Sequence, residues 1–218
     1  MPKYTFLPRR QVNIKNIIFD LGGVVLDIDY RKTRNKFKEL GVSDIESIYT
    51  LSSQVELFNR LDCGFISPEG FRDELRDLLG IELSDVDIDS AWNALILDWS
   101  VERLNFIHEL RNHYKVFLLS NTNVIHTVAF SSSLRTLTGG KDLPCFFEKV
   151  YYSYEVGMRK PDPRIFQLVL DENHLVANET LFIDDTLGHT ESAKKLGLIT
   201  YNIKATGGET ITQLFERQ

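Results

Sequence analysis

Cysteine is scarce in this sequence, with only Cys63 and Cys145 among 218 residues. The two do not form a CxxC pair, and no group of histidines lies near either of them in the sequence. These absences argue against a disulfide framework and against a zinc site. We interpret both cysteines as packing residues of a protein that works in a reducing compartment.

Long hydrophobic runs are also missing. No segment approaches the ~20 consecutive apolar residues that a membrane-spanning helix requires. Basic residues are scattered between Lys3 and Lys15, but no apolar run of the kind found in signal peptides follows them. We therefore expect no membrane partner and a cytoplasmic location.

Positive charge is in deficit. The chain has 25 Lys and Arg against 31 Asp and Glu, a formal net charge of −6, so a nucleic-acid partner is not expected. Only 6 Pro and 13 Gly are present, while 43% of the residues are hydrophobic. This composition is typical of a globular protein with an ordinary core. No pattern in the sequence indicates an oligomeric state.

Short apolar runs alternate with helical patterns over much of the chain. The strongest runs are Asn16–Phe19, Val116–Leu119 and Leu181–Ile183, and weaker ones lie at 149–153 and 199–201. Strands that alternate with helices predict an α/β fold with a doubly wound, mostly parallel, Rossmann-like sheet.

The segment from about residue 30 to residue 98 interrupts this alternation. Ser67-Pro68-Glu69 is typical of a helix start, a further helix is expected from Asp85 to Leu97, and we find no strand in the segment. We predict a core domain made of residues 1–29 and 99–218, with residues 30–98 inserted as a helical cap.

Polar residues follow three of the predicted strands. Asp20 ends the first, Ser120 and Asn121 follow the second, and Asp184 and Asp185 end the third. In doubly wound sheets the ligand site lies beyond the carboxyl ends of the strands, so we expect these side chains to meet. Clustered carboxylates repel one another unless a cation lies among them. Oxygen ligands favour a hard divalent ion, and Mg2+ is the usual one in phosphate chemistry.

Four segments of the chain resemble the ordered motifs of the haloacid dehalogenase superfamily. They are IIFDLGGVV, LLSNT, GMRKPDPRIF and LFIDD. The long helical segment lies where that superfamily inserts a helical cap. The sequence looks most similar to the branch that contains alpha-D-glucose-1-phosphatase and the phosphatase domain of soluble epoxide hydrolase. The resemblance implies a HAD-like fold and a Mg2+-dependent phosphatase of a small phosphorylated metabolite, such as a sugar phosphate.

The resemblance also implies a role for each motif residue. Asp20 would attack phosphorus and form an aspartyl-phosphate. Ser120 and the backbone of Asn121 would bind the phosphoryl oxygens, and Lys160 would neutralise charge on the nucleophile and the transferring group. The implied metal ligands are Asp20, the carbonyl of Gly22, Asp185 directly and Asp184 through a water.

Gly22 departs from the commoner superfamily pattern, which has a second aspartate at this position. That aspartate protonates the leaving oxygen, a contribution of typically ~10²–10⁴-fold in rate. Three explanations stay open: a leaving group that needs little protonation, a substitute acid from the cap, or weak activity.

Alternative structural roles exist for several of these residues. Asp184 and Asp185 could cap a helix, Ser120 could do the same, and an isolated Lys160 would be a solvated surface residue. We expect Arg159 to pair with an acid.

For residues near the motifs and in the cap, we also favour structural roles. We expect His126 and His189 to be packed or exposed rather than ligands. Asp27 and Asp29 are expected to begin the linker to the cap. The aromatic residues of the predicted cap are expected to pack in a core rather than to stack on a sugar. They are Phe58, Phe65, Phe71, Trp92 and Trp99.

Two alternative functions compete with the phosphatase. One is a haloacid dehalogenase-type hydrolase, which would lack the paired acids seen at Asp184 and Asp185. The other is a catalytically weak binding protein with the same fold, and the glycine at position 22 is the feature that keeps it open.

Overall fold

The computed structural model of the chain describes residues 4–9, 13–42 and 52–217. Its centre is a five-stranded parallel sheet with the strand order β6-β5-β2-β7-β8. The strands are β2 (Asn16–Phe19), β5 (Lys115–Ser120), β6 (Lys149–Tyr152), β7 (Thr180–Asp184) and β8 (Ile199–Asn202). The predicted α/β class with a parallel, doubly wound sheet is confirmed.

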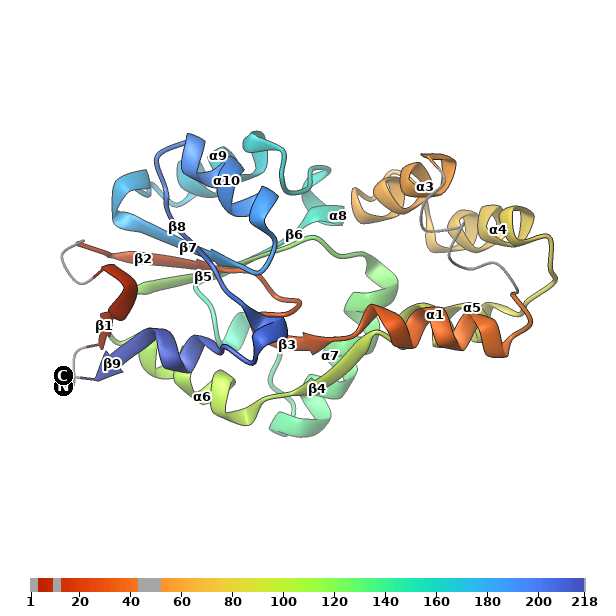
Figure 1. Cartoon of the computed structure of the whole chain (residues 1–218), viewed down its shortest axis with the longest axis horizontal. Coiled ribbons are helices and arrows are strands. Elements are labelled where there is room, and N and C mark those ends of the chain that lie inside the picture. The colour runs from red at the N-terminus through yellow and green to blue at the C-terminus, as the bar shows by residue number, and fades with distance from the viewer. Residues whose placement is uncertain (1–3, 10–12, 43–51, 218) are drawn as a thin grey trace.

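Helices cover both faces of this sheet (Figure 1). One face is covered by α6 (Val101–Leu110) and α7 (Val124–Thr138), the other by α9 (Pro163–Glu172) and α10 (Leu187–Lys195). Ile17 and Phe19 of the central strand face one hydrophobic cluster, and Ile18 faces the other. All three are completely buried. Burial on both faces explains why β2 is a continuous apolar run and not an alternating one.

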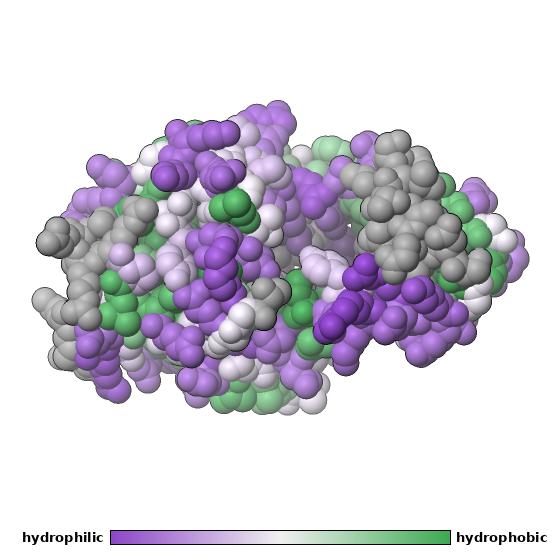
Figure 2. Space-filling view, in the orientation of Figure 1, coloured by the Kyte–Doolittle hydropathy of each residue, from purple (hydrophilic) through white to green (hydrophobic). Residues whose placement is uncertain are grey.

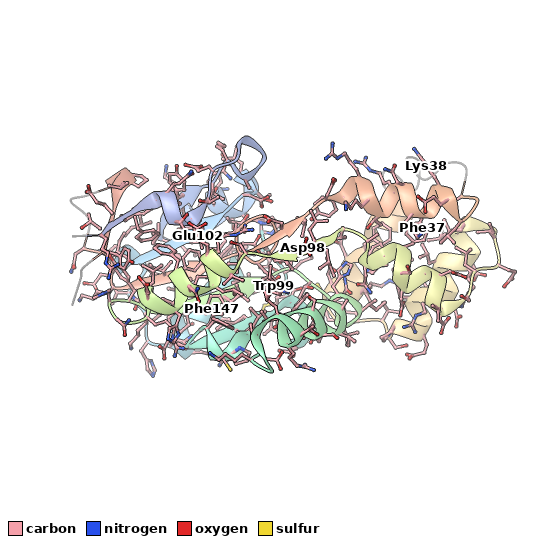
Figure 3. The ribbon with its side chains drawn as sticks, turned by 90° about the horizontal axis from the view of Figure 1, so that it is seen from below. Phe37, Lys38, Asp98, Trp99, Glu102 and Phe147 are labelled. Atoms are coloured by element: carbon pink, nitrogen blue, oxygen red, sulfur yellow. The ribbon has the colours of Figure 1, made fainter. Side chains whose placement is uncertain are left out.

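Four further helices gather at one end of the molecule (Figure 1). They are α1 (Tyr30–Glu39), α3 (Ser52–Asp62), α4 (Pro68–Leu79) and α5 (Asp85–Asn93). Their buried residues, among them Phe37, Phe71 and Trp92, form a hydrophobic cluster that is separate from those around the sheet. Figure 3 shows Phe37 among these helices and Trp99 at the end of the connection to the sheet. As predicted, Ser67 caps α4 through a bond from the Gly70 amide.

The expectation of no strand between residues 30 and 98 is wrong. Helix α5 ends at Asn93, and β4 (Ile96–Trp99) pairs in antiparallel fashion with β3 (Leu26–Ile28). The apolar residues at 95–97 had been assigned to the helix because a short run fits either periodicity. These two strands carry the chain out of the sheet region and back. Asp29, just beyond β3, caps α1 by accepting from the amide of Arg31, a role that the sequence analysis did not predict.

Shorter elements complete the fold. Strands β1 (Tyr4–Phe6) and β9 (Phe215–Arg217) form an antiparallel pair, and α8 (Ser153–Val156) follows β6. The 3-10 helices are η1 (Leu7–Arg9), η2 (Leu143–Cys145), η3 (Ala177–Glu179), η4 (Ala205–Gly207) and η5 (Ile211–Leu214). Cys63 is half-buried and Cys145 is exposed, so the packing role predicted for Cys145 is wrong.

The surface is mainly polar on the face seen in Figure 2, with hydrophobic side chains in small separate areas. In the part of the chain that the structure describes, no helix combines the length and the apolar character needed to cross a membrane.

Candidate active site

Three strand ends meet at one edge of the sheet, as the sequence predicted. Strand β2 lies between β5 and β7, and Phe19 is level with both Leu118 and Ile183. The residues that follow in register are therefore neighbours, and the amide of Asp20 donates to the carbonyl of Ile183 at 2.9 Å. After β2 the chain turns toward β5 and β6, and it later returns to β7 on the other side. The edge is thus the topological switch point of the sheet.

Lys160 lies at the centre of this edge. Its ammonium group donates to Asp20 Oδ1 at 2.7 Å, to Asp184 Oδ2 at 2.7 Å and to the carbonyl of Leu119 at 2.9 Å. The side chain is 1% exposed. Burial disfavours the charged form, but the two carboxylates outweigh it and hold the pKa of Lys160 above its usual value. A solvated surface role for Lys160 is therefore excluded.

Asn121 fixes the position of this lysine. Its side-chain amide donates to the carbonyl of Lys160 at 2.8 Å and accepts from the amide of Lys160 at 2.8 Å. This pair of bonds joins the end of β5 to the loop that precedes α9. The side chain of Asn121 is thus occupied, and its backbone remains for a ligand.

Asp20, Asp184 and Asp185 form a cluster whose carboxylate oxygens lie within 4.8 Å of one another. Burial raises the pKa of Asp20, and the other two carboxylates add to this while Lys160 opposes it. Burial and Asp184 likewise raise the pKa of Asp185. Asp184 is also desolvated, but Lys160 and His189 hold its pKa below the usual range. Lys160 contacts only two of the three acids, so the donor set fits an additional divalent ion with oxygen ligands.

The loop after Asp20 makes room for this cluster. Gly23 has a φ of +76°, and a β-carbon at this position would lie 2.4 Å from Asp185 Oδ2. Gly22 faces the cavity without a side chain, and a β-carbon there would lie 3.0 Å from Cδ1 of Ile28.

A cavity of about 360 Å³ opens above the cluster. Six of the seven motif residues predicted from the sequence line it, and the seventh, Asp184, is completely buried. Ser120 is 2% exposed and lines the cavity, and the cap of α7 is Asn123, not Ser120. The structure therefore brings all the predicted site residues to one place.

Aromatic side chains form part of the cavity wall. Trp92 stacks against His126 with ring centroids 5.4 Å apart and an interplanar angle of 6°, and Phe58 lies 4.9 Å from Trp92. Both Phe58 and Trp92 pack in the hydrophobic cluster of α1, α3, α4 and α5, as predicted, but they also line the cavity. The core packing predicted for Phe65 is wrong, because this side chain is 68% exposed. Burial lowers the pKa of His126 to about 3, so its ring is neutral at physiological pH.

Sequence reasoning missed one contact at this site and left the partner of another unidentified. His189 Nδ1 lies 3.0 Å from both carboxylate oxygens of Asp184, where the sequence had suggested only a packed or exposed ring. Its position in the first turn of the helix after Asp184 was the available signal. Arg159 pairs with an acid, as expected, and the structure identifies that acid as Asp62 of α3, at 3.5 Å.

Comparisons with known proteins agree with this geometry. A family model described as haloacid dehalogenase-like hydrolase matches residues 14–197. The chain is 37% identical over 188 residues to the D-ribitol-5-phosphate phosphatase of Bacteroides thetaiotaomicron, which covers 86% of this chain and 91% of that protein.

Two solved structures are similar over most of their length. One is a wild-type HAD family enzyme from Bacteroides thetaiotaomicron in complex with magnesium and inorganic phosphate. It has a TM-score of 0.83 and 36% identity, and the match covers 93% of this chain and 100% of that chain. The other is a HAD-like family hydrolase from Porphyromonas gingivalis, with a TM-score of 0.79, 37% identity and coverage of 87% and 91%. As its motifs predicted, the chain belongs to the haloacid dehalogenase-like hydrolases and is an enzyme of their phosphatase branch.

Proposed function

We propose that this enzyme is a Mg2+-dependent phosphatase that hydrolyses the phosphate monoester of a small sugar or polyol. The observation that carries the proposal is the position of Lys160, which lies between Asp20 and Asp184 within the carboxylate cluster. The relative named D-ribitol-5-phosphate phosphatase supports the substrate class. The free cysteines fit a cytoplasmic location.

Asp20 is the proposed nucleophile. Its carboxylate oxygen forms a bond to phosphorus as the ester P–O bond breaks, and the electron pair of that bond leaves with the alcohol oxygen, which takes up a proton. Water then attacks the aspartyl-phosphate, which releases phosphate and restores the carboxylate. Lys160 holds Oδ1 of Asp20 at 2.7 Å, so the other oxygen is available for attack.

The remaining motif residues bind charge. Ser120 and the backbone amide of Asn121 would donate to phosphoryl oxygens, and the position of both residues in the cavity beside Asp20 supports this role. Asp20, Asp184, Asp185 and the carbonyl of Gly22 would hold Mg2+, with Asp184 acting through a water. When bound, Mg2+ neutralises charge on the carboxylates and on the phosphoryl group.

The helical segment is the proposed cap. We divide the chain into a core of residues 1–29 and 99–218 and a cap of residues 30–98, joined by the β3–β4 pair. The hydrophobic cluster of α1, α3, α4 and α5, which Ile125 of α7 joins from the core, supports this division. Phe58, Asp62 and Trp92 of the cap segment line the cavity that contains Asp20, so the cap encloses the substrate.

The experiment is phosphate release from D-ribitol 5-phosphate, with Mg2+ and with excess EDTA, by the wild type and Asp20→Asn. We expect activity only with Mg2+, and a loss of at least about 10³-fold in the variant, which lacks the nucleophile. Asp98→Asn is the matched control, since Asp98 is exposed on β4, outside the cavity (Figure 3). Undiminished activity of Asp20→Asn would refute the mechanism. Halide release from a 2-haloacid would favour the dehalogenase reading instead.

A further inference from the structure

A carboxylate of the cap, Asp62, lies in the cavity at a place that the stability of the fold does not explain. It is the last residue of α3, and its side chain is only 18% exposed. A negative charge is unfavourable at the C-terminus of a helix, where the helix dipole is also negative. Burial adds to this cost and raises the pKa of Asp62, although Arg159 and Asn123 oppose the shift.

The contacts of Asp62 leave it with unused acceptor capacity. Asn123, the buried cap of α7, donates to its Oδ1 at 3.2 Å. The nearest guanidinium nitrogen of Arg159 is 3.5 Å from Oδ2, which is longer than the ~2.7–2.9 Å of a charge-assisted hydrogen bond. An ionised carboxylate has about four lone-pair sites. At least one site on Oδ2 is therefore available to a ligand.

Arg159 is the complementary donor. Its Nη1 donates to Asn59 Oδ1, while its buried Nε finds no hydrogen-bond partner among the described residues. A guanidinium has five N–H groups, so several remain for a ligand. Arg159 directly precedes Lys160, and both residues line the cavity beside Asp20. The guanidinium therefore lies next to the Asp62 carboxylate in the cavity that also contains Asp20.

The same cavity supplies an aromatic surface. The parallel rings of Trp92 and His126 and the nearby ring of Phe58 line it together with Asp62 and Arg159. A polyol has C–H groups that pack on aromatic rings, and hydroxyl groups that both donate and accept hydrogen bonds. A carboxylate accepts a hydrogen bond from one hydroxyl, and an adjacent guanidinium donates a hydrogen bond to the neighbouring hydroxyl.

We propose that Asp62 and Arg159 bind neighbouring hydroxyl groups of the substrate and so determine its specificity for polyol or sugar phosphates. The carboxylate of Asp62 accepts from one hydroxyl, and the guanidinium of Arg159 donates to the next. This inference rests on the proposed phosphatase function. In this proposal, the contact between the cap and the core recognises the polyol or sugar part of the substrate.

The test compares D-ribitol 5-phosphate with phenyl phosphate, which has the same transferring group and no hydroxyls. For Asp62→Asn, the ratio of kcat/KM for the two substrates, polyol over aryl, should fall about 10–100-fold, as expected for the loss of a charged hydrogen bond. Asp89→Asn is the matched control. Asp89 also pairs with an arginine in the cap, Arg72 at 2.8 Å, but lies outside the cavity, and the ratio should not change.

An unchanged ratio in Asp62→Asn would overturn the proposal, and so would an equal loss on both substrates, since that would indicate a role in positioning the cap. If Asp62→Asn does not fold, Arg159→Lys gives the same readout, because it keeps the charge and removes the fork of donors.

A binding experiment distinguishes failure of this proposal from failure of the proposed phosphatase function. Equilibrium binding of both compounds is measured in an Asp20→Asn background. Adding Asp62→Asn there should weaken D-ribitol 5-phosphate binding selectively, whether or not the wild type turns it over. Equal affinities with and without Asp62→Asn would overturn the proposal in that background as well.

Discussion

A β-carbon at position 23 would lie 2.4 Å from Oδ2 of Asp185, a separation that non-bonded atoms do not adopt. Gly23 also has a φ of +76°, a conformation that favours glycine. The second glycine of the first motif therefore makes space for a carboxylate that lies more than 160 residues further along the chain. The acid cluster can therefore form only with glycine at position 23.

Gly23→Ala should therefore weaken Mg2+ binding. The methyl group pushes Asp185 away from Asp20, and we expect at least a tenfold rise in the Mg2+ concentration that half-saturates activity, about 1.4 kcal/mol. Titration of phosphate release with Mg2+ measures it. Gly80→Ala is the control, because Gly80 has a φ of +62° at the end of α4 but no atom within 4 Å of the added carbon. If both variants raise the half-saturating Mg2+ concentration equally, the change comes from backbone strain and not from displacement of Asp185.

Removing the central cation should disable catalysis more than it perturbs substrate binding. Lys160→Met leaves Asp20 and Asp184 without their shared partner, which raises the pKa of Asp20 further and removes a positive charge from the site. We expect kcat to fall about 10²–10³-fold, the usual effect of losing one preorganised charged donor. Lys149→Met removes an exposed lysine that pairs with Glu172 and should leave kcat unchanged. A fall in kcat below tenfold for Lys160→Met would contradict the assigned role.

Gly22 offers a gain-of-function prediction. Gly22→Asp alone should displace the side chain of Ile28, because its β-carbon would lie 3.0 Å from Cδ1 of Ile28. Combining it with Ile28→Val removes that methyl group. If the enzyme lacks a proton donor to the leaving oxygen, the double variant should hydrolyse alkyl phosphates about tenfold faster relative to phenyl phosphate, whose leaving group needs less protonation. A ratio of the two rates equal to that of Ile28→Val alone would show that proton donation is not limiting.

Local sequence patterns were enough to predict that the proposed site residues meet at one edge of the sheet. Asp20, Ser120 and Asp184 each end a buried apolar strand, and parallel strands bring their carboxyl ends together. Lys160 was harder to predict, because a lysine in a loop is solvated in most proteins. Only its place in a motif indicated burial.

The cap side of the site was not predictable in the same way. Asp62 lies in a helix, and its contacts with Asn123 and Arg159 depend on how the cap packs against the sheet. The bounds of helix α7 were also not predicted, since its sequence is rich in Ser, Thr and β-branched residues with weak helix propensity. Tertiary packing and the cap formed by Asn123 stabilise it. Such long-range packing leaves no periodic signal in the chain.

His126 couples the stability of the cavity wall to pH. Its pKa is lowered to about 3 by burial, from an ordinary value near 6.5. The unfolded chain therefore binds a proton below about pH 6.5 that the folded chain does not bind until about pH 3. Stability is complete above pH 6.5 and is lost as the pH falls, with a slope of up to about 1.4 kcal/mol per pH unit from this residue.

His126→Gln should remove that slope, because glutamine does not titrate. Denaturant unfolding between pH 4 and 7 measures the free energy of unfolding of the wild type and of His126→Gln. The difference between the two isolates the contribution of His126, because the carboxylates contribute equally to both proteins. The exposed His108, replaced by Gln, is the control and should keep the wild-type slope. Parallel curves for the wild type and His126→Gln would mean that water reaches the ring in the folded protein. Burial would then not hold His126 in its neutral form.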